Sequence, residues 1–175
     1  LHRLVEALLD FGRIESGAME YRMQALDLAA VVSDVAGEFG REAGEKGFAV
    51  HADIPSHPVP VKGDAEALGR ALWNLLDNAV KYSGDSREVW INLSRNGTQA
   101  FVSVADRGLG IPSDEQREVF RKFFRGAASR QGRIHGTGIG LAMVDHIVRA
   151  HRGRVSVESK PGAGSKFTIQ LPVEE

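Results

Sequence analysis

Residues 64–83, DAEALGRALWNLLDNAVKYS, decide the fold, because this one helix combines an apolar face with a polar stripe. Its apolar side chains recur at i, i+3, i+4 and i+7, which predicts a broad buried face. They are Leu68, Ala71, Leu72, Leu75, Leu76, Ala79 and Val80. Asn74, Asn78 and Lys81 fall roughly opposite, since their spacing is also helical. Asparagine prefers caps and turns, so this pair indicates either amides with partners or a solvated face that carries them by chance.

Length and charge limit the class of protein. The 175 residues, of which 42% are hydrophobic, suffice for one main domain and a small appendage. The 22 basic and 23 acidic residues nearly cancel, which argues against nucleic acid as a partner. Cysteine is absent, so disulfides and thiolate metal sites are excluded. With no membrane span and no signal peptide in the sequence, we expect a cytoplasmic piece of a longer protein, whose other parts would decide any membrane anchor.

The first segment predicts the end of a bundle or coiled-coil helix. Its apolar residues repeat with 3,4,3 spacing and stop at Gly17, which suits a helix C-terminus. They are Leu1, Leu4, Leu8 and Phe11, joined by Val5 and Leu9. This seam is too narrow to form a domain alone, so we expect it to need a partner helix.

The remaining elements alternate between strand and helix patterns. A helix is predicted at 28–43, with Asp27 as its cap, and Asn96-Gly97 predicts a hairpin turn. Strands are predicted at 20–26, 48–54, 59–62, 88–94, 100–105, 154–158 and 166–171.

The sequence contains two glycine-rich turns, one after a predicted strand and one after a long polar loop. Residues 106–112, DRGLGIP, allow close backbone approach after a central strand. Residues 136–140, GTGIG, are predicted to begin a helix that runs to about His151, and free N–H groups at such a helix start suit phosphate oxygens. The dinucleotide fingerprint is not met, because Leu141 stands where its third glycine should be and a long polar loop precedes the motif.

That polar loop, residues 113–135, predicts either a functional lid or a disordered connection. Its three phenylalanines, Phe120, Phe123 and Phe124, are either core anchors or a hinge that docks the lid. Its basic residues are individually more typical of a solvated loop than of a phosphate site. They are Arg121, Lys122, Arg130 and Arg133, and the surface is also the expected place of His135.

Four stretches in order resemble the N, first glycine, phenylalanine and second glycine boxes of bacterial sensor histidine kinases. They are NLLDNAVKY (74–82), DRGLG (106–110), VFRKFFR (119–125) and GTGIGL (136–141). GAGSKFTIQLP (162–172) is similar to the last strand of that ATP-binding domain, and LLDFGRIESG (8–17) to the end of the family's dimerisation domain. The resemblance implies an α+β fold, a two-layer sandwich whose mixed sheet is covered by helices on one face. It assigns residues 1–18 to a dimerisation helix and 19–175 to the ATP-binding domain.

Carried onto this chain, the resemblance implies that Asn78 ligates Mg²⁺ beside Asn74 and Lys81, and that Arg125 meets the γ-phosphate of ATP. Asp106 would accept a hydrogen bond from the adenine amino group. Tyr82 would either stack near the base or be an ordinary core tyrosine. The other implied nucleotide-binding residues are Gly108, Gly110, Gly136, Thr137, Gly138, Gly140 and Leu141.

Two departures qualify the resemblance. Related ATPases that hydrolyse ATP have a glutamate where this chain has Asn74, and an amide cannot act as general base, so hydrolysis should be slow. In addition, no histidine is followed by an acidic residue, so we expect the phosphoacceptor to lie outside this chain. The resemblance then implies transfer from Mg-ATP to a histidine on a helix of the same or a second protomer, in a homodimer, with a response regulator as the next acceptor. The alternatives are a protein-serine kinase of the anti-sigma factor type and a nucleotide sensor without transfer.

Overall fold

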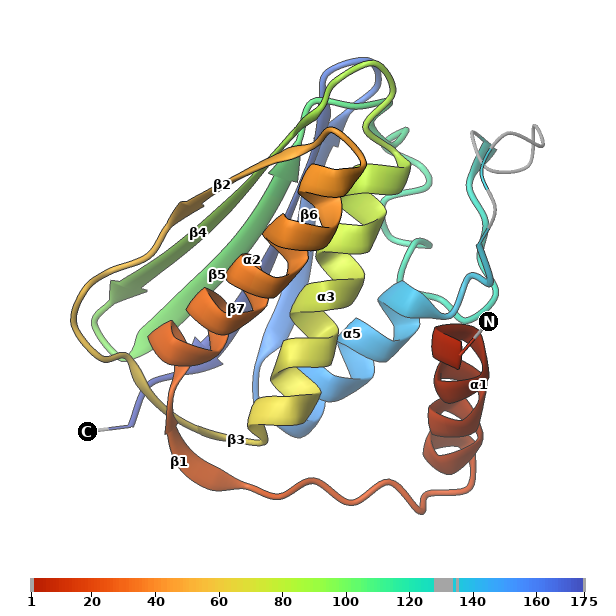
Figure 1. Cartoon of the computed structure of the whole chain (residues 1–175). Helices are drawn as coiled ribbons and strands as arrows, with labels where there is room; N and C mark the ends of the chain where they lie inside the picture. Colours follow the sequence, from red (N-terminus) through yellow and green to blue (C-terminus); the bar gives the residue numbers. More distant parts are fainter. Residues whose placement is uncertain (1, 128–133, 135, 175) are drawn as a thin grey trace.

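The chain folds into two layers, a five-stranded sheet and a set of helices that covers one of its faces (Figure 1). The structure is a computed structural model that describes residues 2–127, 134 and 136–174. In chain order its elements are α1 (His2–Glu15), β1 (Gln24–Asp27), α2 (Leu28–Glu45), β2 (Ala49–Asp53), β3 (Pro60–Gly63), α3 (Ala65–Lys81), β4 (Glu88–Asn96), β5 (Gln99–Asp106), α5 (Gly140–Ala150), β6 (Arg154–Lys160) and β7 (Gly164–Pro172).

The large sheet is mixed, as predicted. Its strand order is β2-β4-β5-β7-β6, in which β2 and β4 are parallel and every other neighbouring pair is antiparallel. β1 and β3 form a separate antiparallel pair, with Gln24 opposite Gly63 and Asp27 opposite Pro60. The strand predicted at 20–26 was therefore too long at its start, because β1 pairs with β3 only from Gln24 onward.

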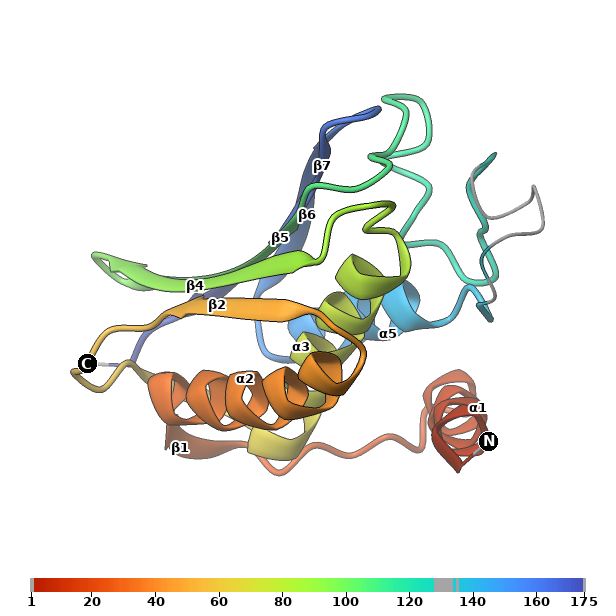
Figure 2. The same ribbon diagram turned by 45° about the horizontal axis from the view of Figure 1, so that its top comes forward.

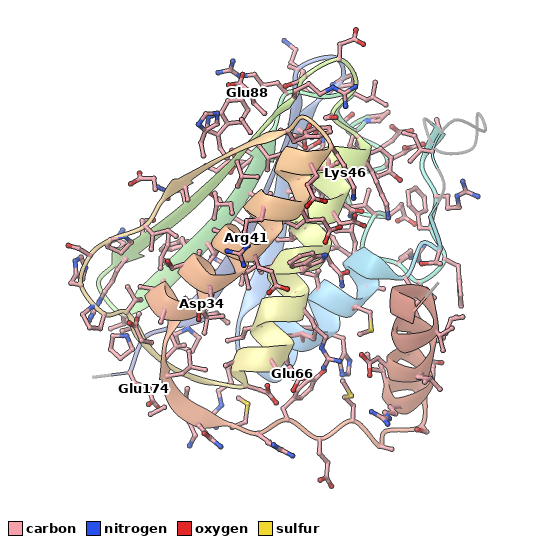
Figure 3. All side chains as sticks on the ribbon, in the orientation of Figure 1. Asp34, Arg41, Lys46, Glu66, Glu88 and Glu174 are labelled. Atoms are coloured by element: carbon pink, nitrogen blue, oxygen red, sulfur yellow. The ribbon has the colours of Figure 1, made fainter. Side chains whose placement is uncertain are left out.

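The core lies between the sheet and helices α2, α3 and α5. Alternate side chains of the central strands point into it, as period-two alternation requires, and the inward set on β4 and β5 is Val89, Ile91, Leu93, Ala100, Val102 and Val104. Figure 2 shows that the helices lie on one side of the sheet only. Charged side chains such as Asp34 and Arg41 lie on the solvent-facing side of α2 (Figure 3).

Both predicted helix caps are confirmed. A carboxylate oxygen of Asp27 accepts from the backbone N–H of Ala29 at 2.9 Å and also from that of Val59 at 2.8 Å. Asp64 caps α3 by accepting from Ala67 N–H at 3.0 Å. Side-chain oxygens at these positions satisfy amides that a helix leaves without an internal partner.

α1 lies beside the main domain and is joined to it by an extended linker (Figure 2). Its helical character, ended by Gly17 with φ +68°, agrees with the sequence pattern. Val5, Leu8 and Leu9 are 48%, 50% and 60% exposed, so this part of the seam is open to a further partner. Within the described ranges, no helix combines the length and the apolarity that crossing a membrane requires.

Candidate functional site

The polar stripe of α3 meets the start of α5. A side chain at Gly140, the first residue of α5, would place its Cβ only 3.9 Å from the amide oxygen of Asn74. Asn74 and Asn78 are half-buried. The apolar residues predicted on the opposite face of α3 are buried, except Val80, which is partly buried. The fold therefore brings together the two motifs that the sequence separates by more than one complete hairpin.

The predicted glycine-rich turn leads into α5 at Gly140. Residues 136–139 are not helical, and the helix begins at Gly140. Gly138 has φ +70°, and a Cβ there would lie 2.8 Å from the carbonyl carbon of Phe123, so the lid passes too close for any side chain. Thr137 Oγ1 accepts from Ile139 N–H at 3.3 Å, which keeps these residues in a turn.

The amide groups at the start of α5 suit an anion. Met143 N–H donates to the Ile139 carbonyl at 2.9 Å, which is the first bond of the helical ladder. The amides of Gly140, Leu141 and Ala142 precede that bond, so helix geometry leaves them for an external acceptor. The helix dipole adds a positive potential at the same end.

Asp106 ends β5 and is buried, with 8% of its surface exposed. Its Oδ1 accepts from the backbone N–H of Gly108 at 2.8 Å. Burial raises the pKa of Asp106, although hydrogen bonds from the backbones of Gly108 and Ser165 lower it in part. A buried carboxylate with a perturbed pKa at a turn is typical of a binding site, and it can accept a hydrogen bond from a ligand amino group.

The first glycine turn packs directly on the end of α3. A Cβ at Gly108 would lie 1.9 Å from the Tyr82 carbonyl oxygen, and the next amide, that of Leu109, donates to the same oxygen at 3.0 Å. Gly110 similarly passes the Lys160 carbonyl, where a Cβ would lie at 2.1 Å. The turn is therefore held between α3 and the β6–β7 connection, and Asp106 is fixed relative to the polar stripe.

Tyr82 is the C-cap residue of α3 and is half-buried. Its role as a base-stacking or core residue stays open. Lys81 forms an ion pair with Asp77 at 2.7 Å on the same helix, and about 40% of its side chain is exposed. The ammonium therefore lies at the solvent edge of the stripe.

The three lid phenylalanines have different environments. Phe120 packs edge-on against Phe167 of β7, with ring centroids 6.0 Å apart, and so anchors the lid to the core. Phe123 is 60% exposed with φ +61°, and its ring contacts Phe11 of α1 with centroids 5.3 Å apart. Phe123 N–H also donates to the Gly138 carbonyl at 2.9 Å. Lid, α1 and second glycine turn thus meet at one residue.

The basic lid residues lie at the surface where they are described. Arg121 pairs with Glu118, Lys122 pairs with Glu15 of α1, and Arg125 donates to the Ile134 carbonyl at 2.9 Å. Arg125 therefore bonds within its own segment in this conformation. Arg130, Arg133 and His135 lie outside the described residues. Gly136 and Thr137 are exposed at the start of the second glycine turn.

Sequence reasoning missed a polar cluster at the opposite end of α3 and α5. His151 is 1% exposed and accepts from Asp64 N–H through Nε2 at 2.9 Å. Tyr21, from the linker, packs edge-on against His151 with centroids 5.5 Å apart. The available signal was the histidine at the end of an apolar helix face, directly before Arg152 and Gly153, but its partner lies 87 residues away.

Comparison with known proteins identifies the family of this chain. Residues 63–175 match the family described as histidine kinase-, DNA gyrase B-, and HSP90-like ATPase. The chain belongs to this family. Its relatives include the sensor-like histidine kinase SenX3 of Mycobacterium tuberculosis (strain ATCC 25618 / H37Rv), which is 37% identical over 97% of this chain and 41% of SenX3. The chain therefore spans less than half the length of that relative.

Solved structures agree with the family assignment. Full-length ShkA in complex with AMPPNP matches 98% of this chain and 35% of its own, with a TM-score of 0.82 and 28% identity. The mycobacterial sensor histidine kinase MprB matches 87% of this chain and 98% of its own, with a TM-score of 0.71 and 29% identity. The predicted two-layer fold is confirmed, and it is that of the ATP-binding catalytic module of these kinases.

Proposed function

We propose that this chain binds Mg-ATP between α3 and α5 and positions its γ-phosphoryl group for transfer to a histidine that is not among its own six. The main support is the approach of Gly140 to the amide of Asn74, because it places an anion-binding helix start beside the polar stripe, one turn before Asn78. The family relationship supports the same site.

Asp106 would select the base. Its buried carboxylate accepts hydrogen bonds, which suits the adenine amino group and opposes the carbonyl of guanine at the same position. Gly108 and Gly110 let the backbone approach closely enough to hold this carboxylate in place. The base end of the site would therefore be formed at the end of β5, with Tyr82 nearby.

Asn78 would hold Mg²⁺. Among the residues that the structure describes, no group of three or more His, Cys, Asp or Glu could hold a metal ion. The donor set still fits Mg²⁺, which prefers oxygen ligands, keeps several waters and is commonly held by one or two protein groups plus phosphate oxygens. When bound, the metal would neutralise phosphate charge. Asn74 and Lys81 would supply further polar contacts along the same stripe.

The start of α5 would hold the phosphates. The turn residues Gly136, Thr137 and Gly138 and the free amides of Gly140 and Leu141 would bind them. Arg125 would reach the γ-phosphate once it leaves its bond to Ile134. The attacking imidazole nitrogen would form a bond to the γ-phosphorus while the bond to the β,γ-bridging oxygen breaks and ADP leaves. The chain's contribution would be positioning and charge stabilisation.

The family relationship supports three proposed partners, which are an acceptor helix, a second protomer and a response regulator. The acceptor histidine would lie on a dimerisation helix of the same or a second protomer, and the exposed Val5, Leu8 and Leu9 of α1 offer an apolar seam to such a helix in a homodimer. A response regulator would be the next acceptor. Residues 1–18 would be the end of the dimerisation domain and 19–175 the ATP-binding domain.

Labelled Mg-ATP tests the transfer. The chain would be mixed with a histidine-bearing dimerisation helix from a related sensor kinase, and a helix with that histidine changed to glutamine serves as control. We expect acid-labile, base-stable phosphate on the first helix only. Acid-stable phosphate on serine would support the serine-kinase alternative, and nucleotide binding without any transfer would support the sensing alternative.

A further inference from the structure

His151 forms a directional bond between the two helices that carry the nucleotide site. Its Nδ1 lies 2.7 Å from the Ile147 carbonyl, so Nδ1 carries the proton. Its Nε2 then presents a lone pair to the backbone N–H of Asp64 at 2.9 Å. The imidazole therefore connects the end of α5 to the cap residue of α3.

The surroundings are shaped for this bond. A Cβ at Gly63 would lie 2.8 Å from Cδ2 of His151, so glycine is needed for the imidazole to approach β3. The Asp64 carboxylate caps α3 through Ala67 N–H and also accepts from Arg22 N–H at 2.9 Å. Tyr21 covers the imidazole from the linker.

The apolar contacts between α3 and α5 set their relative position along the helix axes less sharply than this bond. α5 faces the core with Met143, Val144, Ile147 and Val148, and apolar packing is non-directional. A hydrogen bond weakens steeply with misalignment, so the bond from His151 to Asp64 opposes sliding. At the other end of α5, Gly140 lies beside Asn74.

We propose that His151 is a positioning residue that sets the register of α5 against α3, and through it the distance between the phosphate-binding amides and the Asn74–Asn78 stripe. This inference deepens the proposed function and rests on it for its nucleotide readout. It predicts that loss of the bond to Asp64 impairs phosphate recognition and leaves adenine recognition unchanged. Asp106 lies on β5, and the turn after it packs on α3 and does not depend on the position of α5.

Two variants separate the bonds. His151→Asn keeps a donor for the Ile147 carbonyl but is too short to reach Asp64, whereas His151→Gln places an acceptor near the original Nε2. Calorimetry with Mg-ATP and with adenosine measures the two halves of the site. Hydrogen exchange of residues 143–146, the first amides bonded within α5, measures the start of that helix directly without nucleotide. Thermal unfolding monitors the fold of each variant.

We expect His151→Asn to weaken Mg-ATP binding by about fivefold, which is within the energy that one such hydrogen bond can couple to binding. Adenosine affinity should stay within about twofold of wild type. Exchange at 143–146 should be faster in His151→Asn and near wild type in His151→Gln. Parallel losses for Mg-ATP and adenosine, or unchanged Mg-ATP affinity and exchange in a folded His151→Asn protein, would overturn the proposal. If the wild type does not bind Mg-ATP but His151→Asn still exchanges faster, the positioning role is supported and the proposed function is contradicted.

Discussion

Asp10 of α1 and Arg70 of α3 form an ion pair across 60 residues of sequence. The Asp10 side chain is only 12% exposed and that of Arg70 38%, so the pair is partly buried. Arg70 lies one turn before Asn74 on the polar stripe. α1 is therefore attached to the same helix that carries the candidate metal ligand.

Breaking this pair should loosen α1. We expect Asp10→Asn to destabilise the docking of α1 by roughly 1 kcal/mol, because the amide oxygen can still accept from Arg70 but the attraction between the two charges is lost. Hydrogen exchange of residues 5–15 should become faster while α3 stays protected. Arg149→Gln is the matched control, because its partner Asp145 lies on the same helix. Equal exchange of α1 in wild type and Asp10→Asn would contradict this role.

Asp106→Asn should affect stability and recognition in opposite directions. Because burial raises the pKa of Asp106, its ionised form is disfavoured in the folded state, and a neutral amide should raise the melting temperature of the free protein at neutral pH. The new amide can still accept from Gly108 N–H but can also donate, so selectivity for ATP over GTP should fall. Unfolding scans and nucleotide titrations measure the two effects.

The pH dependence of this stabilisation has a defined sign. Above its raised folded-state pKa, Asp106 is ionised and costs stability relative to the asparagine variant. As the pH falls through that pKa the cost shrinks, and it vanishes below the unfolded pKa of about 3.9. The melting temperatures of the two proteins should therefore converge on acidification. A difference that is constant with pH would show that charge is not its cause.

Tyr21→Phe should be tolerated. Within the described part of the chain the Tyr21 hydroxyl is buried without a hydrogen-bond partner, and burial raises its pKa. Its removal should leave stability unchanged or raise it by up to about 1 kcal/mol. Tyr21→Ala should instead cost about 2 to 4 kcal/mol, because the ring that packs on His151 is lost. Denaturant unfolding distinguishes the two variants, and a large loss in Tyr21→Phe would reveal a partner for the hydroxyl.

The isolated chain should neither label itself nor turn over ATP at more than a trace rate. Asn74 cannot activate water as a general base, and none of the six histidines has the acidic neighbour expected of a phosphoacceptor. Phosphate release and acid-labile label are measured together with Mg-ATP. Robust turnover, or labelling that disappears when one of the six histidines is replaced, would show that the reaction has been assigned wrongly.

Local signals in the sequence were sufficient for most of the fold. Asp27 and Asp64 as caps, the hairpin signalled by Asn96-Gly97 and the period of residues 64–83 depend on neighbours within a few residues, and the structure confirms them. The turn itself is Gly97-Thr98, because Asn96 pairs with Gln99 in the ladder. The glycine turn before α5 was predicted too, but the close passage of Phe123 at Gly138 was not, because it is a contact outside the local sequence.

The candidate site was predictable where motifs carried it and hidden where tertiary contacts did. Asn74, Asp106 and Gly140 were identified by their boxes. The bonds from Asp10 to Arg70 and from His151 to Asp64 join residues 60 and 87 positions apart. No periodicity or turn rule relates such pairs, so only the folded chain reveals them.

The most direct test of the account is the Mg²⁺ dependence of ATP binding by Asn78→Ala. Titration calorimetry with and without Mg²⁺ measures it. Asn92→Ala serves as control, because that amide lies on β4 and donates to Asp53 at 2.9 Å, away from α5. We expect wild type and Asn92→Ala to bind ATP more tightly with Mg²⁺, and Asn78→Ala to lose about tenfold in Mg-ATP affinity with its fold intact. Unchanged Mg-ATP affinity in Asn78→Ala, or wild-type binding of GTP as tight as that of ATP, would contradict the assignment of the site.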